Sequence, residues 1–313
     1  MKEQILSCLG RFPSKAPLQL QRGEKREKGG YTIEKISYQT EPNERVNSLL
    51  LCPQKLRVPA PAVLAIHQHA AQWHMGKSEP AGLAGDPMYH YGADLAKRGY
   101  VVLCPDLLCF EERIPAVFNH SDEERKTYER FEFCRRLSLG SCLQTKYLHD
   151  LQVSLDVLQA LQAAPDCSAE AAPLVDADRI GVIGHSLGGQ QAIMLTFYDE
   201  RVKACVSSCG VSTLSSVYAH HIIHNFALYI PGLLTVCDMD EIVAQIAPRP
   251  LLLLSGREDT ENFPLDGVRQ IEQRAAQVYQ EQGAAHHFVS AICEGGHAFT
   301  HQEQAYDFFD RFL

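Results

Sequence analysis

The chain has 313 residues, of which 45% are hydrophobic and 21% are charged, a composition typical of a globular protein with a sizeable core. Its 29 Lys and Arg residues against 38 Asp and Glu residues give a formal net charge of −9 at pH 7. An acidic chain is a poor binder of polyanions, and its one basic cluster, residues 22–28, is short and interrupted by two glutamates. The composition therefore argues against a nucleic-acid partner.

The sequence also argues against a membrane partner. The longest apolar stretch, Phe226 to Val236, contains a proline and a glycine and is shorter than the roughly 20 residues that cross a bilayer. Near the N-terminus the apolar run 5–9 is too short for a secretory signal. The eleven cysteines form no C-x-x-C pair, and an odd count without a signal indicates reduced thiols. We expect a cytoplasmic protein whose cysteines are mostly small core residues.

Residues 1–60 are expected to form an N-terminal extension that ends in a hairpin. Apolar and polar residues alternate over 31–39, and a second apolar segment, 46–51, follows the turn-prone Pro42-Asn43 pair. Two alternating segments joined by a short turn predict an antiparallel hairpin.

From residue 61 onward, short apolar runs of strand length alternate with longer segments of helical period. Such runs are typical of buried parallel strands. The predicted strands are 62–67, 100–104, 179–183, 204–208, 250–254 and 287–292. Apolar residues spaced three or four apart predict helices over 89–97, 145–163, 190–198, 265–278 and 306–313. Gly99 is expected to end the first of these helices.

This alternation predicts an α/β fold with a mainly parallel central sheet and helices on both faces. One domain, 1–313, accounts for the whole pattern. Two segments, 107–141 and 210–246, interrupt the alternation, and both follow the carboxyl ends of predicted strands. Because folds of this class bind ligands at those ends, we expect the two insertions to roof the active site.

The strongest catalytic signal is the Gly-x-Ser-x-Gly sequence of residues 184–188, which lies between a predicted strand and a predicted helix. A serine at such a sharp turn takes a strained backbone conformation, and glycine at 184 and 188 avoids a steric collision. Ser186 would then be exposed above the sheet as a nucleophile. The Leu187 amide, at the start of the helix, would stabilise an oxyanion.

A serine nucleophile needs a histidine base and an acid that orients it. Asp259 follows the strand 250–254, with Glu258 as an alternative acid beside it. His297 follows the last strand, directly after two glycines that allow a turn toward the serine. These glycines favour His297 over the other histidines of the region, which are His286, His287 and His301.

The sequence resembles the α/β-hydrolase superfamily and, within it, the dienelactone hydrolase and acetyl-xylan-esterase-like families, because it contains five of their short motifs in the same order along the chain. The resemblance covers residues 61–313. It rests on Ala65-Ile66-His67-Gln68-His69, Cys104-Pro105-Asp106, the Gly-His-Ser-Leu-Gly-Gly turn, Ala247-Pro248-Arg249-Pro250-Leu251 with the following Gly256-x-x-Asp259, and Gly296-His297. The resemblance implies hydrolysis of a carboxylic ester or related acyl compound without a cofactor.

The chain departs from these families at two positions. The founding dienelactone hydrolases use a cysteine nucleophile, whereas this chain has Ser186. The chain therefore looks more like a serine esterase than like a dienelactone hydrolase. Many relatives carry His-Gly after the first parallel strand, whereas Gln68 stands in place of that glycine here. The second oxyanion donor is accordingly expected to be the backbone N–H of His69 or of Gln68.

Two groups of histidines could suggest a metal site. In the first group, His67 and His69 are spaced to share one face of a strand, with His74 nearby, but no carboxylate completes a hydrolytic metal motif. In the second group, residues 220–224, a histidine replaces the glutamate of an H-E-x-x-H motif. We predict no metal.

Three residues around the nucleophile are instead expected to bind substrate, and these are His67, His185 and Phe226. For the apolar segment 226–234, the sequence favours an acyl pocket or lid and buried core packing equally. The charged stretch 121–136 is expected to be a solvated helix with ion pairs such as Glu132 to Arg136.

The sequence therefore predicts a serine hydrolase that cleaves a short-chain acyl or acetyl ester of a small molecule. Two alternatives stay open: a serine peptidase of prolyl-oligopeptidase type, and a noncatalytic binding protein that kept the fold. Only about 60 residues precede the module, too few for the extra domain of such peptidases. The intact serine, acid and histidine argue against the noncatalytic alternative. A homo-oligomer is one of the states that the sequence allows.

Overall fold

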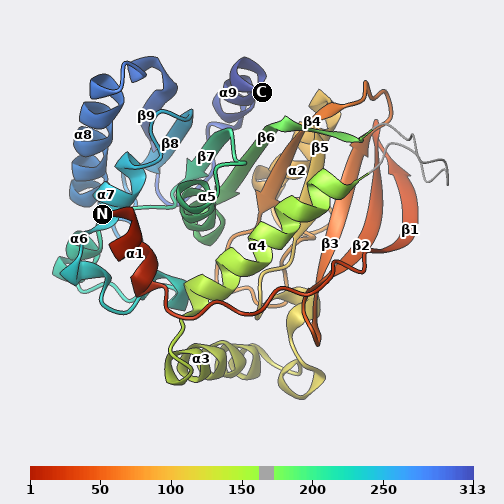
Figure 1. Cartoon of the computed structure of the whole chain (residues 1–313), viewed down its shortest axis with the longest axis horizontal. Helices are drawn as coiled ribbons and strands as arrows, with labels where there is room; N and C mark the ends of the chain where they lie inside the picture. Colours follow the sequence, from red (N-terminus) through yellow and green to blue (C-terminus); the bar gives the residue numbers. More distant parts are fainter. Residues whose placement is uncertain (162–172) are drawn as a thin grey trace.

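The computed structural model describes residues 1–161 and 173–313, and within these ranges nine strands form one sheet in the order β1-β2-β3-β5-β4-β6-β7-β8-β9 (Figure 1). Strands β1 to β3 are antiparallel, β3 pairs antiparallel with β5, and all other neighbours are parallel. The strands are β1 Gln21–Lys28, β2 Tyr31–Glu41, β3 Glu44–Pro53, β4 Ala60–Ile66, β5 Val101–Pro105, β6 Val175–His185, β7 Ala204–Ser208, β8 Leu251–Gly256 and β9 Phe288–Cys293.

This topology confirms the predicted α/β fold with a mainly parallel sheet and the hairpin, which β2 and β3 form with Tyr38 opposite Val46. Every predicted parallel strand is present, with ends shifted by a few residues. Strand β1 was not predicted, because its eight residues, QRGEKREK, are nearly all exposed and show no apolar alternation. Charged side chains on an edge strand discourage pairing with other molecules, so its composition suits its place at the edge of the sheet.

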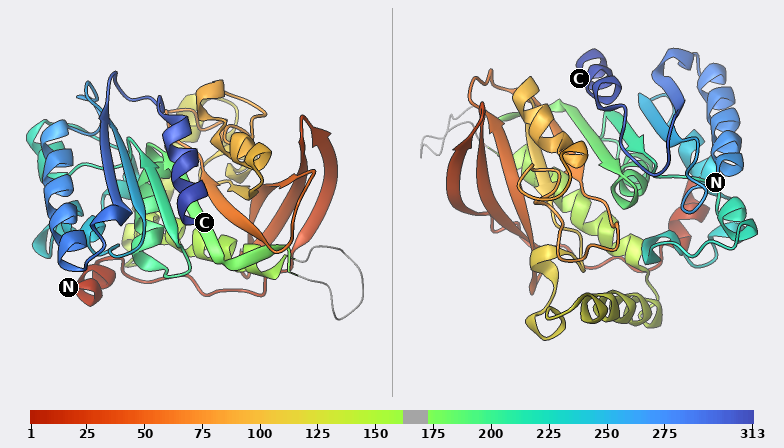
Figure 2. Two further views of the ribbon diagram at one scale, coloured as in Figure 1. Left: turned by 90° about the horizontal axis from the view of Figure 1, so that it is seen from above. Right: turned by 180° about the vertical axis from the view of Figure 1, so that it is seen from behind.

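Helices cover both faces of the sheet, as predicted. Residues of α4, α5, α7 and α8 share one apolar cluster, and residues of α2 and α9 share the other. The view from behind in Figure 2 brings α2 and α9 to the near side. The α-helices are α1 Lys2–Cys8, α2 Tyr91–Arg98, α3 Asp122–Ser138, α4 Leu143–Ala160, α5 Leu187–Tyr198, α6 Leu214–Ala219, α7 Met239–Ala244, α8 Leu265–Glu281 and α9 Gln302–Phe312.

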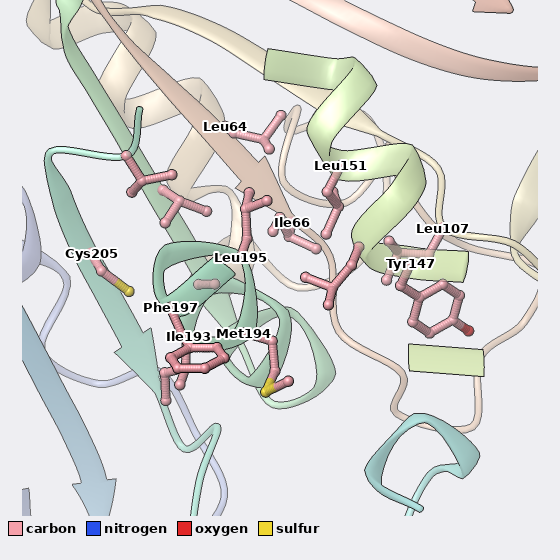
Figure 3. Close-up of a cluster of buried hydrophobic side chains, with 14 of the residues drawn as sticks. Leu64, Ile66, Leu107, Tyr147, Leu151, Ile193, Met194, Leu195, Phe197 and Cys205 are labelled. Carbon is pink, nitrogen blue, oxygen red and sulfur yellow. The ribbon is translucent and has the colours of Figure 1, made fainter. Parts of the chain in front are cut away.

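Helices α4 and α5 pack on the central strands within the larger of the two apolar clusters. Leu64 and Ile66 of β4 belong to the same buried cluster as Leu151 of α4 and Ile193 of α5, and Figure 3 shows their side chains together. Helix α5 is buried along almost its whole length, because it packs on β6 and β7 of the sheet and is flanked by α4 and α7. The turn that precedes α5 is therefore held on a rigid base.

The predicted end of α2 and the predicted free cysteines can be compared with the structure. Gly99 ends α2 with φ 109°, a left-handed conformation that glycine adopts readily. The predicted end of the helix at Ala163 lies outside the described residues, as does Cys167. The other cysteines are free thiols, and six of them are buried. Among the described residues, we find no helix with the length and apolar character to cross a membrane.

Candidate active site

Ser186 occupies a strained turn between β6 and α5. Its backbone has φ 54° and ψ −119°, a conformation that side-chain-bearing residues rarely adopt, and its N–H donates to the Ser208 carbonyl at 2.8 Å. A Cβ at Gly184 would lie 2.2 Å from the carbonyl carbon of Gly188, and a Cβ at Gly188 would lie 2.0 Å from the Ile66 carbonyl oxygen. Only glycine fits at both positions, for the steric reason that the sequence suggested.

His297 and Asp259 form a hydrogen-bonded pair. The Nδ1 atom of His297 lies 2.7 Å from Oδ2 of Asp259. Because a carboxylate can only accept, Nδ1 carries the hydrogen and Nε2 keeps its lone pair for proton transfer. The other carboxylate oxygen of Asp259 accepts from the Asn262 side chain at 3.0 Å. Glu258, the alternative acid, is exposed, whereas Asp259 is buried.

The pair is fixed because the loops after β8 and β9 are packed together. A Cβ at Gly256 would lie 2.1 Å from the Gly296 carbonyl oxygen, so glycine permits this close approach. The Glu258 N–H donates to the Gly295 carbonyl at 2.9 Å. The competing histidines of the region lie elsewhere: His286 and His301 are exposed, and His287 contacts the Pro248 carbonyl at 2.7 Å.

Ser186 and His297 both line a cavity of about 420 Å³. This volume lies within the range of about 300–1,000 Å³ that is usual for small-molecule sites. Both insertions contribute to its wall, because α3 supplies Glu129 and the second insertion supplies Phe226. The cavity is lined by His69, Ala70, Ala71, Trp73, Lys126, Glu129, Arg130, Ser186, Ile223, His224, Asn225, Phe226, Asn262 and His297.

The residues considered as oxyanion donors flank the serine. Leu187 is the first residue of α5, so its amide has no acceptor within the helix. His69 lines the cavity, whereas the Gln68 side chain is buried and donates to Oε1 of Glu79 at 3.0 Å. The carbonyl groups of Ile66 and His67 abut Gly188, which places the start of their loop against the turn that holds Ser186.

His67 and His185 are fully buried and are not among the residues that line the cavity. One ring nitrogen of His67 lies 2.7 Å from the Gln68 carbonyl oxygen, and the other accepts from the Leu107 N–H at 3.1 Å. His185 contacts Ser208 Oγ at 2.9 Å and packs 4.8 Å from the His297 ring. The sequence suggested that both rings contact substrate. The structure does not support direct contact, because both rings are fully buried. Phe226 does line the cavity and stacks on Phe133 at 4.7 Å.

Neither histidine group gathers ligands for a metal. Both ring nitrogens of His67 are engaged within the protein, and His220 lies 3.3 Å from Asp266 on the exposed side of its segment. Two other sets of donor side chains lie close together in the described ranges. One contains Cys209 with Asp259 and His297, and the other contains Glu41, His149 and Asp150. Lys146 forms ion pairs with both carboxylates of the latter set.

The charged helix α3 differs from its predicted role. The ion pair between Glu132 and Arg136 is present at 3.2 Å, but both residues are buried, and Glu129 is 2% exposed. The expectation of a solvated helix was therefore wrong for this face. The sequence reasoning also missed Trp73, Asn262 and Glu129 as parts of the site. No local pattern marks them, because their roles depend on contacts between distant segments.

Glu79, which holds Gln68, gives the fold a distinctive dependence on pH. Burial raises the pKa of Glu79 to about 7, although the Gln68 hydrogen bond opposes this effect. The folded state thus keeps a proton that the unfolded state releases near pH 4.5, so this contribution to stability is present below that pH and lost as the pH rises through about 7.

We therefore expect the stability of Glu79→Gln relative to the wild type to increase by roughly 1–3 kcal/mol as the pH is raised from about 5 to about 8. Glutamine has the same shape and does not titrate, so only the wild type should lose this contribution. Urea unfolding of both proteins at the two pH values measures the difference. A difference that stays constant with pH would show that Glu79 titrates normally.

The chain is similar in sequence to known proteins. Residues 78–309 match the family model described as the dienelactone hydrolase family. YtaP of Bacillus subtilis (strain 168), whose name places it among hydrolases, is 30% identical over 307 residues, which are 95% of this chain and 92% of YtaP.

Solved structures share the fold, and two of them illustrate the similarity. The BF1801 structure from Bacteroides fragilis NCTC 9343 has a TM-score of 0.71 at 19% identity, covering 93% of this chain and 73% of its own. The glucuronoyl esterase from Solibacter usitatus has a TM-score of 0.69 at 17% identity, covering 99% and 91%.

Proposed function

The chain belongs to the dienelactone hydrolase family, and from this premise we propose that it is a serine esterase that cleaves a carboxylic ester through an acyl-enzyme. The observation that carries the proposal is the hydrogen bond of 2.7 Å between His297 and Asp259, at a cavity that Ser186 also lines. A nucleophile, a base and an orienting acid are what acyl transfer needs. The likeness to a glucuronoyl esterase adds support from the fold.

In the proposed reaction, Ser186 Oγ attacks the ester carbonyl carbon while Nε2 of His297 takes the hydroxyl proton. Asp259 holds the Nδ1 hydrogen and stabilises the imidazolium that forms. The oxyanion is held by the Leu187 amide and by the amide of His69 or Gln68. His297 then protonates the leaving alcohol. A water molecule, activated by the same histidine, hydrolyses the acyl-enzyme and restores the serine. The cycle needs no cofactor.

We also propose that residues 1–313 form a single domain and that the insertions 107–141 and 210–246 roof its active site. Residues of both insertions in the cavity wall support this arrangement. Phe226 is proposed to contact the substrate, whereas His67 and His185 are proposed to support the oxyanion loop and the His297 ring.

A cavity of about 420 Å³ that is shared between acyl and alcohol groups favours a short acyl chain. We expect kcat/KM for p-nitrophenyl acetate to exceed that for p-nitrophenyl decanoate by about tenfold or more, because a long acyl chain and the alcohol group together exceed what this volume holds. Initial rates over a series of chain lengths measure this preference. Equal or rising kcat/KM with chain length would contradict the short-acyl assignment, and no hydrolysis of any ester would contradict the esterase itself.

A further inference from the structure

A buried carboxylate on α3 holds the loop that follows β4. We call residues 67–73 the oxyanion loop. Both oxygens of Glu129 lie 3.1 Å from Nε2 of His69, and one of them accepts from the Trp73 ring N–H at 2.8 Å. Glu129 is 2% exposed, so little of its carboxylate is left in contact with water. One side chain from the first insertion thereby ties two residues of the oxyanion loop.

The Glu129–His69 pair differs from the Asp259–His297 pair, although both lie at the same cavity. Nδ1 of His69 accepts from the Ala71 N–H at 3.0 Å, so the hydrogen lies on Nε2 and points to Glu129. Both ring nitrogens of His69 are therefore occupied. His297 instead keeps Nε2 available for the serine proton. The first pair cannot pass a proton without breaking a bond that shapes the loop, so its role is to hold a conformation.

The oxyanion loop needs such an anchor because its backbone is strained. Ala70 and Ala71 have φ values of 45° and 54°, in the left-handed region that residues with a Cβ avoid. The His69 ring packs edge-on against Trp73, with the ring centroids 5.3 Å apart. A strained loop persists only where its surroundings hold it in place, and Glu129 contacts it from outside the loop.

The oxyanion loop also lies directly against the nucleophile turn. The carbonyl oxygens of Ile66 and His67 fill the space where a Cβ of Gly188 would stand, at 2.0 and 2.8 Å. His69 and Ser186 line the same cavity. A shift of the loop therefore changes the distance between its amides and the oxygen that becomes negative during acyl transfer, a distance on which oxyanion stabilisation depends steeply.

We propose that Glu129 is a positioning residue for ester hydrolysis, which holds the oxyanion loop through His69 and Trp73 so that its amide can stabilise the oxyanion. The inference rests on the proposed function. In this proposal the first insertion contributes to transition-state stabilisation as well as to the cavity wall, through a side chain of α3 that does not touch the reacting atoms. Glu129 should affect the transition state more than substrate binding.

Glu129→Ala and Glu129→Gln test this role, with Glu132→Gln as the matched control. Glu132 is also a buried acid of α3, but it pairs with Arg135 and Arg136 instead of with the oxyanion loop. We expect Glu129→Ala to lower kcat for p-nitrophenyl acetate roughly 10- to 100-fold while KM changes less than about threefold. Glu129→Gln keeps one acceptor and should lose less. The control should retain kcat within about twofold of the wild type.

A boronic acid supplies a second readout that a merely structural role would not move. Phenylboronic acid forms a tetrahedral adduct with a serine oxygen, so its inhibition constant reports on the oxyanion site. The constant should rise in Glu129→Ala by about the same factor as kcat/KM falls. Thermal unfolding shows whether each variant is folded, and if Glu129→Ala is not, the isosteric Glu129→Gln carries the test.

The outcomes separate this inference from the proposed function. An active wild type that binds the boronic acid, with folded Glu129 variants of unchanged kcat and unchanged inhibition constant, would overturn the positioning role alone. The same would follow if Glu132→Gln lost as much activity as Glu129→Gln. A wild type that neither hydrolyses the ester nor binds the boronic acid would overturn the proposed function, and the inference with it.

Discussion

Replacing Ser186 with alanine is expected to lower kcat for p-nitrophenyl acetate by about 10⁴-fold or more while the protein stays folded. The hydroxyl is the proposed nucleophile, and the amides and His297 alone leave only residual catalysis. Alanine has the same Cβ as serine, so the strained backbone at φ 54° costs the same in both proteins. The small side chain of alanine also fits the space that the serine occupies.

Steady-state kinetics of the purified variant, together with circular dichroism and a thermal melt, measure this effect. Ser215→Ala is a suitable control, because that serine is exposed and does not line the cavity. The control should keep wild-type turnover. A folded Ser186→Ala protein with wild-type turnover would show that another group is the nucleophile.

His297→Ala is expected to be nearly as damaging, since the serine and the histidine act as one unit and the loss of either removes the activated nucleophile. We expect kcat to fall by about 10⁴-fold, with little change in KM. The hydrogen bond to Asp259 at 2.7 Å and the place of His297 in the cavity wall single out this ring among the histidines near the C-terminus.

His301→Ala is the matched control for this prediction. His301 lies four residues further along the chain, is exposed and contacts the Thr300 hydroxyl at 2.9 Å, outside the cavity. Its replacement should leave kcat within about twofold of the wild type. The opposite ranking of the two variants would assign the base to His301 and would require a different arrangement of the last loop.

The parallel strands and the close approach of Asp259 and His297 could be predicted because their signals are local. The central parallel strands are buried on both faces, so they are largely apolar, as in Leu251–Gly256. The glycines at 184 and 188 mark a turn that no larger residue fits. Once the strands are known, Asp259 and His297 stand out as the residues that follow two neighbouring strand ends, β8 and β9.

The edge strand and the insertion could not be predicted, because their structure depends on distant contacts. Strand β1 has no apolar face and is ordered by pairing with β2. Helix α3 carries charge on all sides, and nothing in its sequence tells buried Glu129 from exposed Glu123. The difference arises because His69 and Trp73, more than 50 residues earlier, offer hydrogen bonds to one and not the other.

The same limit applies to the buried ion pairs of α4. Lys146 and Asp150 are buried on α4, with 2.8 Å between the ammonium and a carboxylate oxygen, and Arg113 lies 2.8 Å from the other carboxylate oxygen. The cationic neighbours hold the pKa of Asp150 well below its usual value. A helical pattern predicts that such charged residues face solvent, and only the partners that the fold brings to them make their burial tolerable.

The measurement that tests the central claim most directly is covalent labelling with a fluorophosphonate, followed by intact mass spectrometry and peptide mapping. The reagent reacts with a serine only where a base activates it and an oxyanion site accepts the adduct. The account predicts a single adduct, on Ser186, that is absent from Ser186→Ala and forms much more slowly in His297→Ala. An adduct on another residue, or an unlabelled wild type that still hydrolyses esters, would contradict it.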